Sequence, residues 1–302
     1  MANARTASIT QKQVAAFLKP RPRDSNKGMF GTVTVIGGAN GMVGAALLAG
    51  RAALKMGAGC VHVGMLADNA PVVDLLQPEL MLHGAADAMR GFQHPNPSPV
   101  GEEANAKNNF NSHVLVVGCG LGKSPAAQKL LYDALLIDVA LVLDADALNL
   151  IAQRPDLRGM LHTRKAAAVF TPHPGEAARL LDCKTEDIQA DRTGAALALA
   201  GKLHGSVVLK GAGSLCATRD GKLHINRTGN PGMSSAGMGD VLSGMIAAFV
   251  AQGLDTDEAL LLAVYLHGAA GDELAKQHAT LGMSATEVTE WARWLLNRIS
   301  PK

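Results

Sequence analysis

The 302-residue chain is poor in aromatic residues and in net charge, and each shortage excludes a class of function. Aromatic residues make up 3% of the chain, and the formal net charge is only +2. Proteins that bind single-stranded nucleic acid stack bases on aromatic rings, and both nucleic acid and anionic membranes attract strongly basic surfaces. We therefore expect neither nucleic acid nor a membrane as a partner.

Cysteine is also scarce, and its spacing excludes two kinds of site. The four cysteines are widely separated and form no C-x-x-C pair: Cys60, Cys119, Cys183 and Cys216. This pattern argues against a zinc site and a disulfide framework, and cysteines beside apolar segments usually pack as small core residues. Charges such as Arg51 and Lys55 interrupt the most apolar helices, and residues 1–19 contain no cleavable hydrophobic segment. We expect a cytoplasmic protein.

What the chain does contain is glycine, 33 residues, and an alternation of short β-branched runs with longer alanine- and leucine-rich runs. This alternation predicts an α/β fold with a mostly parallel central sheet and helices on both faces. Asp220-Gly221 is a tight-turn signal between two strands of a hairpin. The expected strands are 32–36, 61–65, 114–117, 140–143, 167–170, 207–209, 215–218 and 222–226. The expected helices are 44–56, 125–137, 190–203, 241–252, 257–275 and 285–296.

The domain organisation follows from the same alternation. It resumes directly after a polar, proline- and asparagine-containing stretch at 84–112, so we interpret that stretch as a surface loop insertion. Residues 1–302 then form a single domain, and residues 1–23 are its poorly packed N-terminal arm.

The most informative segment is a loop of glycines and small residues at 228–240, which leads directly into the apolar run 241–250. The free N–H groups of such a loop and the positive end of the helix dipole bind phosphate. Asp240 ends the loop, where a carboxylate would repel phosphate. We interpret Asp240 as a general base that removes a proton from a substrate hydroxyl as that oxygen attacks phosphorus. The alternative is that Asp240 only caps the helix.

Glycine-rich turns also follow other predicted strands. Segments 37–44 and 118–124 each come directly after a strand, at the sheet edge where ligands bind in such folds. Neither is a standard nucleotide fingerprint, because a P-loop needs glycine at Val117 and 118–122 read G-x-G-x-G. Taken alone, each segment is an ordinary tight turn. Taken together, the two turns indicate a ligand that lies across the crevice at the ends of the strands.

Two further strand ends carry charged side chains. The sequence K-G-A-G-S at 210–214 offers an ammonium group and backbone amides to a nucleotide phosphate. Asp144 and Asp146 follow the strand 140–143 and are candidates for orienting a substrate. Equally, Asp146 is a candidate cap for the next helix.

The motif T-P-H-P-G-E at 171–176 follows another predicted strand. Its two prolines fix the backbone before a helix that starts near Pro174, which positions His173 to hydrogen-bond a substrate amide or a phosphate. Glu176 would face the phosphates and act through Mg²⁺ or a bridging water. The alternative for Glu176 is a partner of the helix dipole in the first turn.

Taken in order, these motifs closely resemble those of the ADP-dependent NAD(P)H-hydrate dehydratases, a branch of the ribokinase-like superfamily. The resemblance spans about residues 24–290, and its most specific parts are 171–176 and 229–240. It implies a ribokinase-like, three-layer α/β/α fold. Related kinases commonly carry asparagine where His173 stands, so this histidine favours the bacterial type of dehydratase.

The resemblance implies a repair reaction. NADH or NADPH that has been hydrated at C6 of the nicotinamide ring, (6S)-NADHX or (6S)-NADPHX, would be dehydrated at the expense of ADP, giving AMP and phosphate. The C6 hydroxyl would first be phosphorylated, with Asp240 as its base, and phosphate would then be eliminated. Mg²⁺ would neutralise the transferring group near Glu176.

The resemblance also assigns the other site residues. Those implied to bind the hydrate, beside Asp240, are Ala45, Ala46, Gly120, Gly122 and His173. Those implied to bind the nucleotide are Lys210, Gly211, Ala212, Gly213, Ser214 and Gly239. The backbone N–H groups implied to form the anion hole belong to Gly237, Met238 and Gly239.

Partners are likewise implied. Many relatives carry an epimerase domain, so we expect a separate NAD(P)H-hydrate epimerase to work with this chain, and we expect a homotetramer. Two other functions use the same base and anion loop. One is a ribokinase-like kinase for a vitamin precursor alcohol, against which the T-P-H-P-G-E and G-N-P-G-M motifs argue; the other is a non-catalytic nucleotide sensor.

Overall fold

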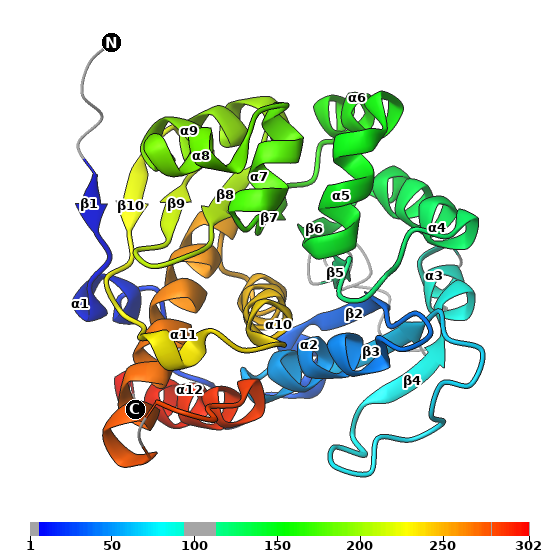
Figure 1. Ribbon diagram of the computed structural model, residues 1–302. Helices are drawn as coiled ribbons and strands as arrows, with labels where there is room; N and C mark the ends of the chain where they lie inside the picture. Colours follow the sequence, from blue (N-terminus) through cyan, green and yellow to red (C-terminus); the bar gives the residue numbers. More distant parts are fainter. Residues whose placement is uncertain (1–5, 94–112, 279, 302) are drawn as a thin grey trace.

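One twisted sheet runs through the protein (Figure 1). The structure, a computed structural model, describes residues 6–93, 113–278 and 280–301. Within these residues ten strands pair in the order β1-β10-β9-β8-β7-β6-β5-β2-β3-β4. All neighbouring strands are parallel except that β9 runs antiparallel to both β8 and β10. The strands are β1 (Ala7–Ser8), β2 (Thr32–Gly37), β3 (Cys60–Met65), β4 (Met81–Gly84), β5 (His113–Val117), β6 (Ala140–Leu143), β7 (Ala168–Phe170), β8 (Ser206–Leu209), β9 (Leu215–Ala217) and β10 (Leu223–Ile225).

Helices cover both faces of the sheet, which confirms the predicted mostly parallel, three-layer α/β architecture (Figure 1). One face carries α3 (Ala85–Gln93), α4 (Pro125–Leu136), α5 (Ala145–Gln153), α6 (Pro155–Thr163), α7 (Pro174–Leu181), α8 (Thr185–Ala190) and α9 (Arg192–Leu203). The other carries α1 (Gln11–Ala15), α2 (Val43–Lys55), α10 (Met238–Ala251), α11 (Thr256–His278) and α12 (Ala285–Ile299).

The strands divide their side chains between two separate cores. In β5, Val114 and Val116 belong to the core under α2 and α10, whereas Leu115 and Val117 belong to the core under α4 and α5. Successive side chains of a strand point to opposite faces, so a strand buried on both faces reads as a continuous apolar run. This is why the apolar runs of the sequence predict the central strands.

Helices α2 and α10 lie unusually close because small residues meet between them. A Cβ atom on Gly244 of α10 would overlap the backbone carbonyl oxygen of Ala49 in α2. Both helices begin at the same edge of the sheet, so this contact fixes the start of one relative to the start of the other.

Two predictions about irregular segments are wrong. The arm at 1–23 is not poorly packed where the structure describes it: β1 pairs with β10, and Ile9 and Val14 are buried in the core. The segment 84–112 is not a loop at its start, because 85–93 form α3. Ala85 and Met89, one helical turn apart, bury that helix against the sheet. Residues 94–112 lie outside the described residues.

The predicted strands and helices are present with ends shifted by a few residues. The prediction missed β1, β4, α1, α3, α5, α6 and α8, most of which are short. Among the described residues, no helix is both long enough and apolar enough to cross a membrane.

Candidate active site

The carboxyl ends of five parallel strands and the start of α10 meet at one edge of the sheet. Backbone hydrogen bonds tie the loops there together: the Gly38 N–H donates to Cys119 O at 3.0 Å, and the Lys210 N–H donates to Pro172 O at 2.9 Å. The turns after β2, β5, β7 and β8 are therefore neighbours, as the predicted parallel order requires.

Helix α10 begins earlier than the sequence predicts, and this changes the place of Asp240. Its N-cap is Gly237, whose φ of +89° lies in the left-handed region that favours glycine. Asp240 therefore occupies the third helical position, and the alternative that it caps the helix is wrong. The N–H groups of the first turn have no acceptor inside the helix. This turn is the predicted anion hole of Gly237, Met238 and Gly239.

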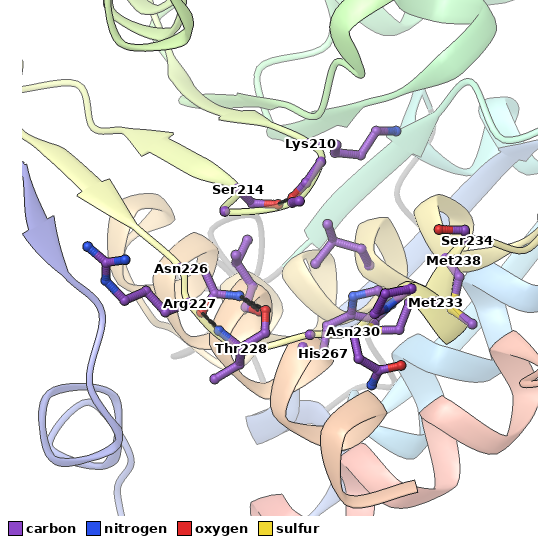
Figure 2. A pocket seen from close by; sticks show the side chains of 18 of the residues that line it. Lys210, Ser214, Asn226, Arg227, Thr228, Asn230, Met233, Ser234, Met238 and His267 are labelled. Carbon is purple, nitrogen blue, oxygen red and sulfur yellow. Dashed lines mark hydrogen bonds between the residues drawn. The ribbon is translucent and has the colours of Figure 1, made fainter. Parts of the chain in front are cut away.

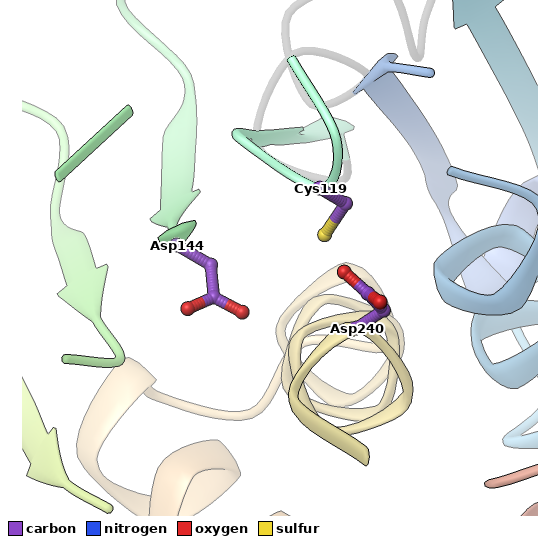
Figure 3. Close-up of side chains that lie close together, drawn as sticks. All are labelled: Cys119, Asp144 and Asp240. Carbon is purple, nitrogen blue, oxygen red and sulfur yellow. The ribbon is translucent and has the colours of Figure 1, made fainter. Parts of the chain in front are cut away.

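The Asp240 side chain faces two groups at the ends of β5 and β6, the thiol of Cys119 and the carboxylate of Asp144 (Figure 3). One ligand atom from each of the three groups lies within 4.8 Å of the others. Burial, together with the negative charge of Asp144, raises the pKa of Asp240 to about 6. A carboxylate with a pKa near neutral accepts a proton much better than an exposed aspartate, as a general base must.

Asp144 is itself held in place by four groups. Its Oδ1 atom accepts from Lys210 Nζ at 2.8 Å and from the Ala145 N–H at 2.9 Å, and its Oδ2 atom accepts from Ser243 Oγ at 2.9 Å. Burial alone would raise the pKa of Asp144, but Lys210 and hydrogen bonds from Thr171 and Ser243 hold that pKa below its usual value. Asp144 is thus a buried anion whose cation is Lys210.

The structure corrects which aspartate caps α5. The N-cap is Asp144, whereas Asp146 accepts a hydrogen bond from the Gly122 N–H at 2.8 Å across to the turn after β5. Asp146 therefore supports the glycine turn at 118–122 rather than its own helix.

The T-P-H-P-G-E motif forms a capping box at the start of α7. His173 Nδ1 accepts from the N–H groups of Gly175 and Glu176, and Glu176 Oε2 accepts from the His173 N–H at 2.8 Å. Glu176 thus stabilises the first turn of α7, which is the alternative role that the sequence suggested for it. With Nδ1 occupied as an acceptor, the half-exposed imidazole of His173 carries its proton on Nε2. Burial and the charge of Lys210 lower its pKa, which favours the neutral ring.

Glu176 also lies close to the Lys210 ammonium. The distance from Glu176 Oε2 to Lys210 Nζ is 4.0 Å, and the Glu176 side chain is 5% exposed. Burial raises the pKa of this carboxyl group. A buried carboxylate with Oε2 already bound to a backbone N–H has little room to ligate a cation directly. Its Oε1 atom lies 3.3 Å from His173 Nε2, so the protonated ring nitrogen faces this carboxylate.

Beside the first turn of α10 lies a pocket of about 470 Å³ (Figure 2). Seven predicted residues line it: Lys210, Gly211, Ala212, Gly213, Ser214, Met238 and Gly239. The structure thus gathers the whole predicted nucleotide set around one cavity. The cavity is bounded on its other sides by Asn226, Arg227, Thr228, Gly229, Asn230, Pro231, Met233, Ser234, Leu242, Val264, His267 and Gly268.

The residues predicted to bind the NAD(P)H hydrate lie outside this pocket. Ala45 and Gly120 come together between α2 and the turn after β5, because a Cβ on Gly120 would lie 3.1 Å from the Ala45 Cβ. Gly122, in the same turn, lies beside Ala39 instead. Ala46 is fully buried. The pocket lining does not include the other predicted site residues: Ala45, Ala46, Gly120, Gly122, His173, Asp240, Glu176 and Gly237. Asp240, next to Cys119, therefore belongs with the Gly120 turn.

Sequence reasoning missed two residues at the site. Cys119 is a buried core residue, as predicted, but it also lies beside Asp240, for which its place inside the G-x-G-x-G turn at a strand end is a usable signal. His267 lines the pocket, and its buried Nε2 atom has no hydrogen-bond partner among the described residues. Burial lowers the pKa of His267 to about 4, so the ring is neutral.

Comparison with known proteins gives a consistent result. A family model described as NAD(P)H-hydrate dehydratase matches residues 33–293. The ADP-dependent (S)-NAD(P)H-hydrate dehydratase of Neisseria meningitidis is 40% identical over 287 residues, which cover 93% of this chain and 90% of that protein.

Two further matches differ in extent. The bifunctional NAD(P)H-hydrate repair enzyme Nnr of Coxiella burnetii is 39% identical over 97% of this chain, which spans 56% of that protein, or about half its length. Among solved structures, the ADP/ATP-dependent NAD(P)H-hydrate dehydratase of Bacillus subtilis, co-crystallised with ATP and Mg²⁺, has a TM-score of 0.82 and 29% identity. It covers 99% of this chain and 100% of its own.

Proposed function

The chain belongs to the NAD(P)H-hydrate dehydratase family, and from this premise we propose that it converts (6S)-NADHX and (6S)-NADPHX to NADH and NADPH at the expense of ADP. The observation that carries the proposal is the position of Asp240. It stands in the first turn of α10, one residue after the part of the turn that lines the nucleotide pocket, and it faces the Cys119–Gly120 turn on the other side.

In this arrangement the two ligands meet at the start of α10. ADP occupies the pocket with its phosphates toward Lys210 and the 211–214 turn, and the hydrated nicotinamide ring lies against Ala45, Gly120 and Gly122. The N–H groups of the first turn then point at the terminal phosphoryl group.

Asp240 takes the proton of the C6 hydroxyl as that oxygen attacks the β-phosphorus of ADP. The bond between the β-phosphorus and the bridging oxygen breaks, and AMP leaves. The lone pair of the ring nitrogen then expels phosphate from C6, and loss of a proton from C5 restores the ring double bond. The first step is phosphoryl transfer, in which positioning and charge stabilisation supply most of the rate.

Lys210 and Glu176 have distinct roles in this scheme. The Lys210 ammonium is the fixed positive charge beside the phosphates, and Asp144 holds it there. The neutral His173 ring, fixed by its capping hydrogen bonds, donates from Nε2 to the hydrate. Glu176 fits a water-mediated contact to Mg²⁺, which supplies charge neutralisation to the nucleotide phosphates when bound.

The experiment is a direct assay. Purified protein is mixed with NADHX, Mg²⁺ and either ADP or ATP, and the absorbance of reduced nicotinamide is followed while AMP and phosphate are quantified. Recovery that depends on ADP supports both the reaction and the donor, whereas recovery with ATP alone overturns the donor. No recovery with either donor, together with phosphorylation of a vitamin precursor alcohol, would replace the proposal by the kinase function.

We further propose that the chain acts with an NAD(P)H-hydrate epimerase and assembles as a homotetramer. The bifunctional names of the Coxiella burnetii and Escherichia coli relatives support the action with an epimerase. Mixed hydrate epimers would then be consumed completely only when epimerase is added to the assay. Size-exclusion chromatography with light scattering tests the second.

A further inference from the structure

A buried thiol lies beside the proposed base and is not used by the reaction scheme. Cys119 is fully buried, and its Sγ atom points toward the Asp240 carboxylate and lies within 4.8 Å of one of its oxygens (Figure 3). Its backbone is fixed, since Cys119 O accepts the Gly38 N–H and the flanking Gly118 and Gly120 both adopt positive φ. The turn therefore aims one side chain at Asp240 and holds it there.

The charges around Asp240 explain why this contact matters. Burial disfavours the negative charge of ionised Asp240, and the nearby carboxylates of Asp144 and Asp146 disfavour it as well. Lys210 favours that charge, but its ammonium already pairs with Asp144. Among the groups that favour ionised Asp240, the thiol acts more strongly than Lys210, and it does so as a hydrogen-bond donor.

The thiol is suited to donate rather than to react. Burial and the two aspartates raise the pKa of Cys119 well above its usual value, so the S–H bond stays intact across the working pH range. A protonated cysteine is a poor nucleophile and a weak hydrogen-bond donor.

We propose that Cys119 is a positioning residue for the general base: its S–H group donates to the Asp240 carboxylate, fixes the orientation of that carboxylate and keeps it ionised. The inference rests on the proposed role of Asp240 as the base. Cys119 contacts neither reacting atom, so its effect passes entirely through Asp240.

The test compares three variants by the pH dependence of kcat/KM. Cys119→Ala removes the donor, Cys119→Ser restores an O–H donor, and Cys216→Ala is the matched control. Cys216 is equally buried, in the hydrophobic core at β9. In Cys119→Ala we expect the midpoint of the acid limb to rise by about 0.5–1 pH unit, with activity below the midpoint reduced about 3- to 10-fold. Cys119→Ser and Cys216→Ala keep the wild-type midpoint.

A second readout does not depend on activity. The infrared S–H stretch of Cys119, isolated as the difference between wild type and Cys119→Ser, should shift as the pH passes the midpoint of Asp240. In Asp240→Asn this pH-dependent shift should vanish.

The outcomes separate this inference from the proposed function. An unchanged midpoint in Cys119→Ala, or an equal shift in Cys216→Ala, overturns the role of Cys119 while leaving Asp240 as the base. An S–H stretching frequency that does not change with pH overturns the role of Cys119 as well, even if Cys119→Ala does not fold. Near-normal activity in Asp240→Asn would instead overturn the proposed base itself.

Discussion

The ammonium nitrogen of Lys210 lies 2.8 Å from Oδ1 of Asp144, although 66 positions separate the two residues in sequence. The pair joins the end of β8 to the end of β6, and the Ser243 hydroxyl extends it to α10. A single buried carboxylate thus connects the nucleotide turn, the sheet edge and the helix that carries Asp240.

Lys210→Met should therefore destabilise the protein strongly. It leaves Asp144 buried without its cation, and breaking one side of a buried ion pair costs about 3–5 kcal/mol of unfolding free energy. Urea denaturation measures this. The double variant Lys210→Met/Asp144→Asn removes the orphaned charge and should recover a large part of the loss. If the two single losses simply add, the pair is not coupled and the interpretation is wrong.

Asp240→Asn should lose turnover but retain ADP binding. Removal of a general base typically lowers kcat by about 10²–10⁴-fold, and the pocket lining does not include Asp240. A steady-state assay measures the turnover, and isothermal titration calorimetry measures the binding of ADP. Asp156→Asn, an exposed aspartate paired with Arg154 on another helix, is the control and should change neither. Loss of ADP binding in Asp240→Asn would place the carboxylate on the nucleotide instead.

The acid limb of the pH–rate profile should have its midpoint near the pKa of Asp240, about 6. The base must be ionised to take a proton, so kcat/KM rises as pH increases through this value and levels off above it. The measurement is kcat/KM from pH 4.5 to 8.5 in buffers of constant ionic strength. An acid limb centred near pH 4 would show that burial does not perturb the base.

The same raised pKa predicts how stability depends on pH. The pKa of Asp240 is about 6 in the folded protein and about 3.9 in the unfolded chain, so the folded protein binds this proton more tightly. The resulting stabilisation is fully present at low pH and is lost as the pH rises through about 6. Asp240→Asn carries no charge to bury. It should exceed wild type in unfolding free energy by on the order of 2 kcal/mol at pH 8, and the difference should vanish near pH 4. Equal stability at both pH values would contradict the shift.

Gly244→Ala should destabilise the fold, because its Cβ atom would overlap the Ala49 carbonyl oxygen and force α10 away from α2. Overpacking of this kind costs about 1–3 kcal/mol. Gly201→Ala in α9 is the matched control, since its Cβ meets nothing within 4 Å and alanine favours a helix by about 0.5–1 kcal/mol. Thermal melts of both variants test this. Equal melting temperatures would show that the two helices adjust freely.

The parts of the fold that were predictable are those that carry a local pattern. Strands β5 and β6 are buried on both faces and read as continuous apolar runs. Strand β4 has largely exposed residues and gives no such run. Among the residues of α3 whose burial the structure describes, Ala85 and Met89 alone are deeply buried, and the helix precedes a proline-rich stretch, so the sequence of the whole segment looks irregular.

For the site, the resemblance carried by the glycine turns and their order predicted one part of the pocket lining, residues 210–214 with Met238 and Gly239. The contacts between side chains were not predictable in the same way. The pairing of Lys210 with Asp144 and the contact of Cys119 with Asp240 join residues far apart in sequence, and only the strand order brings them together. The role of Asp146 depended on the turn at 118–122 lying opposite α5, which no local spacing reveals.

The pairing of β1 with β10 has a consequence for how the protein meets other copies of itself. Strand β10 would otherwise end this side of the sheet with free N–H and C=O groups, and such an edge is a template on which another chain can add a strand. Residues 7–8 occupy that position, and the Ile9 N–H continues the pairing to Ile225 O. Within the described residues, this side of the sheet therefore ends in a two-residue strand, and so short an edge is a poor template for a further chain.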